Sequence, residues 1–310
     1  MIVTVTPNAA IDRTAVVSGF SLNAVNEVKN MPALPGGKGI NVARVLKAFG
    51  QPVVATGFIG GETGKTIKMG LERSGVGTDF AIVMGESRTC LKIVDPQRMM
   101  VTELNELGPE ITAQEVTKLT AILNKWSQKA SDAVFSGSLP PGAPQDSYRK
   151  WVEGFQRIGG KAYVDARGAV LYHALEARPY LVKPNQKEAE ELVGFSLDSE
   201  TRISQAIEYF MAKAQIALIT LGERGAAVGC EGERWRAYAP PVKAVNPIGS
   251  GDAFLAGFIV GLKRHLPLKD CLRLATATGA ANSQAPVAGM IRLEQVDRLS
   301  SQVRVEALRR

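Results

Sequence analysis

The chain has 310 residues, of which 45% are hydrophobic and 22% charged, a composition typical of a globular protein with a sizeable core rather than a disordered or fibrous one. Lys and Arg number 37 against 30 for Asp and Glu, so the formal net charge is +7, which favours anionic partners. The cations are scattered and nowhere form a block of about five or six, so a nucleic-acid-binding arm is not expected.

The residue types that build metal sites and disulfide frameworks are scarce. The three cysteines, Cys90, Cys230 and Cys271, lie far apart and form no Cys-x-x-Cys pair. We therefore expect neither a disulfide framework nor a zinc site. The two histidines, His173 and His265, are too few for a histidine-rich metal site, and we expect both to be structural.

Signals for secretion or membrane insertion are weak throughout. The N-terminal residues lack a basic region followed by a long apolar region, which a secretion signal requires. The longest apolar stretch, residues 253–262, is about half as long as a membrane crossing. We therefore expect a cytoplasmic protein without a membrane partner.

Short β-rich runs alternate with stretches that carry apolar residues at three- and four-residue spacing along nearly the whole chain. This alternation predicts an α/β fold in which helices cover a mainly parallel sheet. Many of the strands end at small or polar residues, and the carboxyl ends of parallel strands meet at one edge of a sheet, so we expect a shared ligand-binding crevice there. The predicted strands are residues 2–5, 53–58, 133–135, 162–164, 181–182 and 218–221.

Two segments interrupt this alternation, residues 15–31 and 88–103, which are extended and rich in turn-forming residues. We expect them to pair as a small accessory sheet that covers the crevice. Neither an internal repeat nor a linker divides the chain. The sequence therefore predicts a single domain over residues 1–310, with lid segments at about 12–34 and 88–104.

The strongest local motif is Asn-Pro-Ile-Gly-Ser-Gly-Asp-Ala-Phe at residues 246–254. Gly249 and Gly251 allow the backbone to turn its N–H groups toward one point, and the apolar run that follows predicts a buried helix. A helix N-terminus of this kind forms a cradle for a phosphate-sized anion. Asp252 lies in the first turn, where a carboxylate either caps the helix or accepts a proton from an attacking hydroxyl, and the local sequence leaves both roles open.

A second glycine cluster, residues 35–43, opens another predicted helix. Taken alone, it is more typical of a tight turn with an incidental lysine than of a site. Lys38 in a glycine-rich loop nevertheless suits a polyhydroxy or phosphorylated ligand, because bare backbone permits close approach and the ammonium supplies charge. Asn41 is expected to face the same opening.

Two other nucleotide-binding motifs fail on spacing. The tripeptide Gly-Lys-Thr at residues 64–66 resembles part of a P-loop, but Ile59 stands where its first glycine is required, so Lys65 is expected to be a solvated surface residue. A dinucleotide-binding Gly-x-Gly-x-x-Gly motif is also lacking, because Phe254 and Val42 occupy the third glycine position of the two clusters.

The two glycine clusters, in this order, resemble the two signatures of the ribokinase-like, or PfkB, family of carbohydrate kinases. The resemblance covers essentially the full length and implies a three-layer α/β fold with a small β lid. Within the family, residues 58–62, 107–111 and 246–252 are most similar to the tagatose-6-phosphate kinase branch, followed by 1-phosphofructokinase. Further matching segments are residues 6–12, 85–89, 136–140, 183–188 and 220–222.

The resemblance implies ATP-dependent phosphorylation of a ketohexose phosphate to a bisphosphate, and it assigns the site residues by position. It makes Asp252 the general base. The residues whose backbone N–H groups would hold the transferring phosphate are Gly249, Ser250 and Gly251. The residues that would contact sugar hydroxyls are Asp12, Gly37 and Asn41. The residues that would meet the phosphate already on the substrate are Lys38 and Arg88.

The resemblance also implies ATP and magnesium as cofactors. Asn185 and Glu188 match a motif associated with Mg²⁺, which they would hold through water. The residues that would contact ATP are Lys183, Asn185, Thr220, Gly222, Gly225 and Asn282. The resemblance leaves open a monovalent cation, regulation by ATP and a homodimer formed through the lid.

Departures from the family pattern leave the choice of sugar open. Ala9 stands where proline is common, Arg167 where small residues are common, and residues 288–291 also differ. The alternatives to tagatose 6-phosphate are fructose 1-phosphate and fructose 6-phosphate. A family member acting on an unphosphorylated sugar or nucleoside is disfavoured by Lys38 and Arg88. A basic nucleic-acid-binding protein is a remote alternative, disfavoured by an aromatic content of only 6%.

Overall fold

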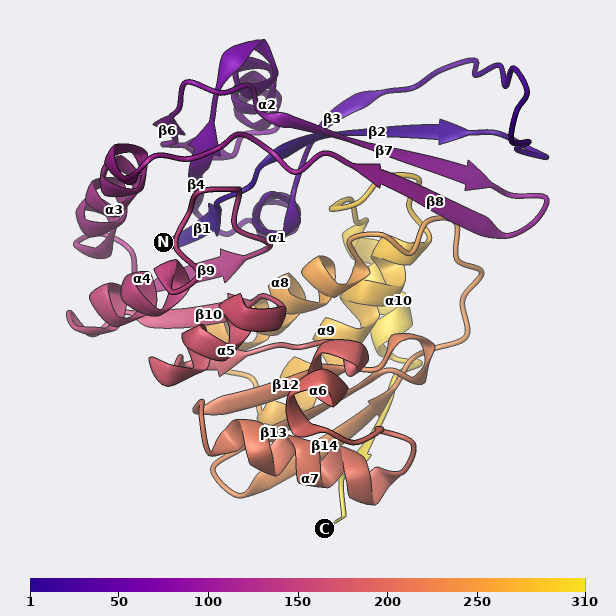
Figure 1. Cartoon of the computed structure of the whole chain (residues 1–310). Coiled ribbons are helices and arrows are strands. Elements are labelled where there is room, and N and C mark those ends of the chain that lie inside the picture. Colours follow the sequence, from indigo (N-terminus) through magenta and orange to yellow (C-terminus); the bar gives the residue numbers. More distant parts are fainter. Residues whose placement is uncertain (310) are drawn as a thin grey trace.

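The structure is a computed structural model that describes residues 1–309, in which a large twisted sheet lies between two layers of helices, as Figure 1 shows. The helices that cover one face are α1 (Lys38–Ala48), α2 (Gly61–Arg73), α8 (Ser250–Lys263), α9 (Leu268–Ser283) and α10 (Leu293–Ser300). The helices that cover the other face are α3 (Ala113–Ser127), α4 (Ser147–Gln156), α5 (Gly168–Glu176), α6 (Gln186–Val193) and α7 (Glu200–Met211). Within residues 1–309, every helix is too short or too polar to span a bilayer.

The large sheet contains eleven strands within the described residues. In spatial order they are β15 (Arg304–Ala307), β14 (Glu233–Tyr238), β13 (Ala226–Cys230), β12 (Ile216–Thr220), β11 (Leu181–Val182), β10 (Lys161–Asp165), β9 (Asp132–Ser136), β1 (Ile2–Thr6), β4 (Val53–Ile59) and β5 (Gly77–Thr78), with β6 (Ala81–Ile82) also paired to β4. All pairs from β5 to β12 are parallel, which confirms the predicted architecture. The antiparallel edge formed by β13, β14 and β15 was not among the expectations from the sequence.

The two-residue periodicity of the strands sends alternate side chains into two separate cores. In β12, Ile216 and Leu218 belong to the core under α8 and α9, whereas Ala217 and Ile219 belong to the core under the other helix layer. A sheet buried on both faces in this way needs strands that are apolar at consecutive positions. This explains why the six predicted strands are short continuous apolar runs, and each of them is present with bounds shifted by at most two residues.

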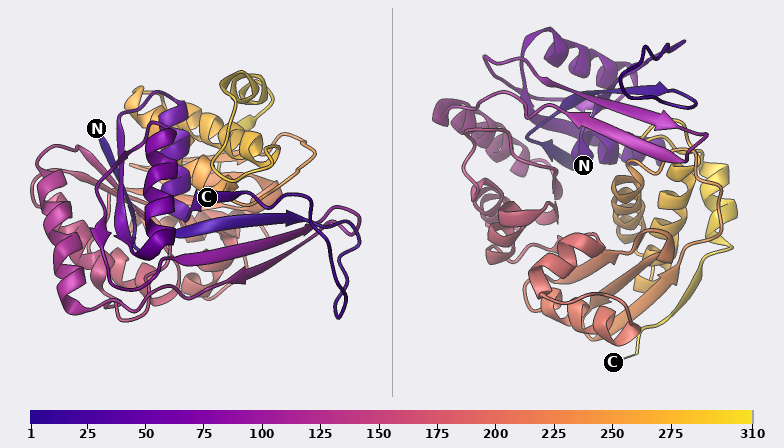
Figure 2. Two further views of the ribbon diagram at one scale, coloured as in Figure 1. Left: turned by 90° about the horizontal axis from the view of Figure 1, so that it is seen from above. Right: turned by 45° about the vertical axis from the view of Figure 1, so that its right-hand side comes forward.

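A second, smaller sheet projects from the body, as both views in Figure 2 show. We call it the small sheet. In spatial order, its strands are β3 (Ala33–Gly36), β2 (Ala10–Val16), β7 (Arg88–Asp95) and β8 (Met100–Asn105). The predicted pairing of two accessory segments is therefore present, but the first segment was misplaced. Residues 17–32 are irregular, and the strands that pair lie on either side of them.

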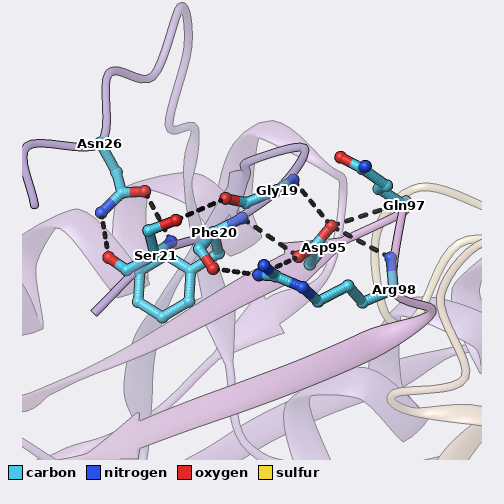
Figure 3. A network of polar contacts seen from close by, with 7 residues as sticks. All are labelled: Gly19, Phe20, Ser21, Asn26, Asp95, Gln97 and Arg98. Atoms are coloured by element: carbon cyan, nitrogen blue, oxygen red, sulfur yellow. Dashed lines mark hydrogen bonds and ion pairs between the residues drawn. The ribbon is translucent and has the colours of Figure 1, made fainter.

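A buried carboxylate ties the tip of the small sheet together (Figure 3). Asp95, only 4% exposed, accepts hydrogen bonds from the backbone N–H groups of Gly19 (3.0 Å) and Phe20 (3.1 Å). It also accepts from the N–H groups of Gln97 (3.0 Å) and Arg98 (3.3 Å) in the turn between β7 and β8. The pKa of Asp95 lies below its usual value, because these backbone donors outweigh the effect of burial. One side chain thus joins two segments that are separated by more than seventy positions in the chain.

Candidate active site

A cavity of about 1080 Å³ lies between the carboxyl edge of the large sheet and the small sheet. Residues from nearly every motif described above line this cavity. The predicted site residues that line it are Asp12, Gly37, Lys38, Asn41, Arg88, Lys183, Asn185, Glu188, Thr220, Gly222, Gly225, Gly249, Ser250, Gly251 and Asp252. The strand-end turns therefore share one crevice, as the parallel topology requires.

Both glycine clusters form helix-opening turns that other residues cannot make. Gly37 has φ of +109°, and a Cβ there would lie 2.7 Å from the Thr6 side chain, so α1 can begin at Lys38 only after a glycine. Gly249 has φ of +78°, and a Cβ there would lie 2.7 Å from that of Ala288. The turn at Gly249 directs the start of α8 into the cavity, where the first N–H groups of a helix lack intrahelical acceptors.

Asp252 is the one buried acid at the start of α8. Its side chain is 6% exposed, and its Oδ2 accepts a hydrogen bond of 2.8 Å from Nδ2 of Asn41 on α1. Burial and the neighbouring Asp165 carboxylate raise the pKa of Asp252 to about 7, although Lys38 and the bond from Asn41 act in the opposite direction. The carboxylate bonds across to α1 rather than capping its own helix, and a carboxyl of this pKa is suited to exchange a proton near neutral pH.

A second buried acid, Asp165, lies at the end of β10 between two lysines. Its Oδ1 is 2.7 Å from Nζ of Lys38, and its Oδ2 is 3.0 Å from Nζ of Lys183. Burial alone would raise the pKa of Asp165, but Lys183 and Lys38 hold it below its usual value. Burial likewise opposes the charge on Lys38, but Asp165, Glu188 and Asp252 outweigh burial and raise its pKa. The lysine therefore stays protonated beside the acids.

Lys38 points toward Glu188 as well, with 3.8 Å between Nζ and Oε1. The ammonium group thus bridges the end of β10 and the start of α6. Asp165 directly follows the predicted strand at residues 162–164 but was not among the predicted site residues. The signal was present, because Asp165 is the polar residue that terminates a buried strand at the crevice edge.

Asn282 is the one predicted contact residue that lies off the cavity. It is fully buried on α9, and its Nδ2 donates to the Ile248 carbonyl (3.0 Å) and to Ser250 Oγ (3.3 Å). Its Oδ1 accepts from the N–H of Gly289 (2.8 Å). These bonds hold the turn before α8 against the loop around residue 289, and the expected contact of Asn282 with ATP stays a prediction.

The inner face of the small sheet supplies the opposite wall of the cavity. Along β7, Arg88, Cys90 and Lys92 line the cavity at alternate positions, as a strand requires. Lys92 was not among the predicted site residues, yet its Nζ lies 2.7 Å from Oδ2 of Asp12, and both side chains are largely buried. The guanidinium of Arg88 donates to the backbone carbonyl of Asn8 (3.1 Å). Applying the two-residue period to residues 88–92 would have placed Lys92 on this face.

Comparison with known proteins decides the family. Residues 3–291 match the pfkB family carbohydrate kinase. The chain belongs to this family. A Staphylococcus aureus protein provisionally named a phosphofructokinase is 29% identical over 99% of each chain, with a TM-score of 0.84. A Thermotoga maritima protein provisionally named a 1-phosphofructokinase is 26% identical over 100% of each chain, with a TM-score of 0.91. Phosphofructokinase-2 from Escherichia coli, in complex with potassium, shares the fold at 24% identity over 97% of this chain and 98% of that one, with a TM-score of 0.90.

Membership of the pfkB family confirms the ribokinase-like α/β fold and the carbohydrate kinase activity expected from the two glycine signatures. It also implies ATP as phosphoryl donor and a divalent metal. Thr220 ends β12, Gly222 begins the turn that follows it, and both residues line the cavity. The carboxyl edge of the sheet is the usual place for a nucleotide in such folds.

The pfkB kinase has a donor set that suits magnesium held through water. Asn185 and Glu188 form a reciprocal cap on α6, in which Asn185 Oδ1 accepts from the Glu188 N–H and Glu188 Oε2 accepts from the Asn185 N–H, both at 2.9 Å. Within residues 1–309 we find no group of three or more His, Cys, Asp or Glu residues placed to enclose a metal. Magnesium commonly keeps several waters and binds through one or two carboxylates and substrate phosphates, and Glu188 fits that mode.

Proposed function

We propose that this kinase transfers the γ-phosphoryl group of ATP to a ketohexose phosphate, with tagatose 6-phosphate as acceptor and tagatose 1,6-bisphosphate as product. The proposal depends on the buried Asp252 carboxyl, whose pKa near 7 suits a general base and which shares its cavity with Asp12 and Arg88. The cationic Arg88 supplies a bidentate partner for a phosphate on the acceptor. Relatives named as phosphofructokinases support a phosphorylated acceptor.

Asp252 acts on the acceptor hydroxyl in the proposed reaction. The hydroxyl oxygen attacks the γ-phosphorus, its proton passes to Oδ1 of Asp252, and the bond from the γ-phosphorus to the β,γ-bridging oxygen breaks so that ADP leaves. Asn41 occupies Oδ2, which leaves Oδ1 for the proton. The N–H groups of Gly249, Ser250 and Gly251 at the start of α8 stabilise the charge that spreads over the transferring phosphoryl oxygens.

Other residues of the cavity bind and orient the two substrates. Asp12, Gly37 and Asn41 orient the sugar hydroxyls, and Lys38 joins Arg88 in neutralising phosphate charge. The proposed ATP contacts that line the cavity are Lys183, Asn185, Thr220, Gly222 and Gly225. Asn282 is the sixth proposed contact, at the turn before α8. When bound, magnesium neutralises charge on the phosphate oxygens, and Asn185 and Glu188 would orient its waters.

Substitution of the proposed base tests the mechanism. Asp252→Asn preserves the shape of the side chain and the contact with Asn41, but it cannot accept a proton. We expect kcat to fall about 100- to 10,000-fold, while both KM values change little. Turnover is measured by coupled ADP release, and circular dichroism confirms that the variant is folded. Turnover near that of the wild type would contradict the role of Asp252.

A panel of sugar phosphates tests the choice of acceptor. The kcat/KM ratios for tagatose 6-phosphate, fructose 1-phosphate and fructose 6-phosphate measure discrimination directly. We expect the highest value for tagatose 6-phosphate. A higher value for either fructose phosphate would identify the enzyme as a 1-phosphofructokinase or a 6-phosphofructokinase instead.

Arg88→Met should chiefly raise KM for the sugar phosphate and weaken discrimination against unphosphorylated sugars, and unchanged kinetics would remove Arg88 from the site.

We also propose that the small sheet is a lid on a single kinase domain and that two copies pair through it. All six residues of β8 are exposed, among them Met100 and Leu104 at 57% each. An exposed, partly apolar strand at a sheet edge favours pairing with another chain. Sedimentation analysis should give a dimer that Leu104→Glu dissociates.

Because an E. coli relative is seen with potassium, the activity should also be compared in potassium and sodium salts.

A further inference from the structure

The turn that follows β12 has a shape fixed by a close approach to β14. The turn consists of a 3₁₀ segment, Gly222–Arg224, and then Gly225, whose φ is +89°. A Cβ on Gly225 would lie 2.1 Å from the carbonyl oxygen of Ala237. Gly222 and Gly225 face the cavity, so the backbone of this turn forms part of the cavity wall on the side proposed for ATP.

A buried guanidinium lies behind this turn. Arg236 on β14 is 3% exposed, and its Nη2 donates to the carbonyl of Arg224 (2.6 Å). Its Nη1 donates to the carbonyls of Ala226 (3.0 Å) and Ala237. Arg224 and Ala226 are the two neighbours of Gly225, so one side chain holds the backbone on both sides of the glycine.

The charge on Arg236 is costly to bury, so its place in the structure is better explained by the directions of its hydrogen bonds than by its charge. Burial lowers the pKa of Arg236, and its acidic partner, Glu200 at 3.2 Å from Nε, has a side chain that is 49% exposed. Only arginine presents a planar set of donors that reaches several carbonyls in different directions. The ladder between β13 and β14 does not need this side chain, because Ala226 and Ala237 are already paired through their backbones.

Arg236 does not itself line the cavity. It reaches a bound nucleotide only through the turn that it supports. We propose that Arg236 is a positioning residue for ATP, which keeps the Gly222–Arg224 turn and Gly225 in the conformation that receives the nucleotide. This inference rests on the proposed function, since it takes ATP to bind at that turn.

A matched pair of variants tests the proposal. Arg234 lies on the same strand, is also largely buried, and donates to Ser204 Oγ (2.9 Å) and pairs with Glu208 (3.3 Å), away from the turn. We expect Arg236→Met to raise KM for ATP roughly tenfold and to leave KM for the sugar phosphate within about twofold, because small displacements of a binding wall are costly. Arg234→Met should change neither KM. Arg236→Lys, which keeps the charge but not the planar donors, should give an intermediate KM for ATP.

The outcomes separate this inference from the proposed function. Equal changes in both KM values, or equal effects of Arg236→Met and Arg234→Met, would show that Arg236 acts only on stability and would overturn the proposal. If Arg236→Met does not fold, Arg236→Lys decides, and an unchanged KM for ATP in that variant overturns it. Calorimetric binding of ADP is the second readout. A wild-type protein that binds no ADP contradicts both proposals, whereas wild-type binding with unaltered affinity in the Arg236 variants contradicts this one alone.

Discussion

Replacing Asn41 with leucine perturbs the proposed base without touching it. Leucine matches asparagine in branching and in the number of side-chain heavy atoms but removes the donor that holds Oδ2 of Asp252 at 2.8 Å. That hydrogen bond favours the ionised carboxylate, so its loss raises the pKa of Asp252 above its present value of about 7. The base must be ionised to accept a proton, and activity should therefore require a higher pH in the variant.

The size of the shift follows from the energy of the bond. A hydrogen bond to a charged group contributes about 1.5–3 kcal/mol, and one pKa unit corresponds to about 1.36 kcal/mol, so the pKa of Asp252 should rise by roughly one to two units. At pH 7 the wild-type carboxyl is about half ionised, whereas the variant is about 1–10% ionised. We expect kcat/KM at pH 7 to fall about 5- to 50-fold and to recover substantially above about pH 9.

The assay is the pH profile of kcat/KM for the sugar phosphate, measured by coupled ADP release from about pH 5.5 to 9.5. The wild-type profile should fall about tenfold per pH unit well below pH 7. Asn105→Leu is a control, because Asn105 lines the same cavity but donates to Glu103 rather than to Asp252. An acid limb that coincides in wild type and Asn41→Leu would refute the reasoning, since a lost sugar contact alone lowers the profile without moving it.

Two ion pairs give further predictions, one for substrate binding and one for stability. Lys92→Met leaves Asp12 without its partner in the cavity, and we expect KM for the sugar phosphate to rise about tenfold while KM for ATP stays unchanged. Lys92→Arg should restore the wild-type KM for the sugar phosphate. Equal changes in both KM values would contradict this role of Lys92. Lys263→Met leaves Asp132, which is 1% exposed, with the hydroxyl of Tyr163 among its remaining donors. The free energy of unfolding should fall by about 2–3 kcal/mol, measured by urea denaturation, while kinetics stay as in the wild type. An unchanged midpoint would show that this pair contributes nothing.

The local features of the site could be predicted from the sequence because they depend on a few adjacent residues. Glycines at 37 and 249 mark backbone turns with positive φ, and the apolar run after Asp252 marks a buried helix. The strands were predictable for a similar reason, since each is a short apolar run ended by a polar or small residue. Together these rules placed most of the predicted site residues around one cavity.

The contacts that the sequence did not reveal are those between distant segments. The bond from Lys38 to Asp165 spans 127 positions, and that from Lys92 to Asp12 spans 80. Both depend on which strands become neighbours, and β1 lies between β4 and β9, an order that periodicity cannot supply. Asn282 shows a related gap between position in the chain and position in the fold. Its position in the chain is near the site, but its side chain points into the packing behind the turn before α8.

The network around Asp95 determines how the small sheet can move. Because a single carboxylate binds both the segment after β2 and the turn between β7 and β8, these two parts cannot separate without exposing a buried charge. If the cavity opens, we therefore expect the small sheet to move as one unit, with bending at the strand ends that lie beside the large sheet. The width of the cavity entrance would then depend on bending at those strand ends and not on the conformation of the tip.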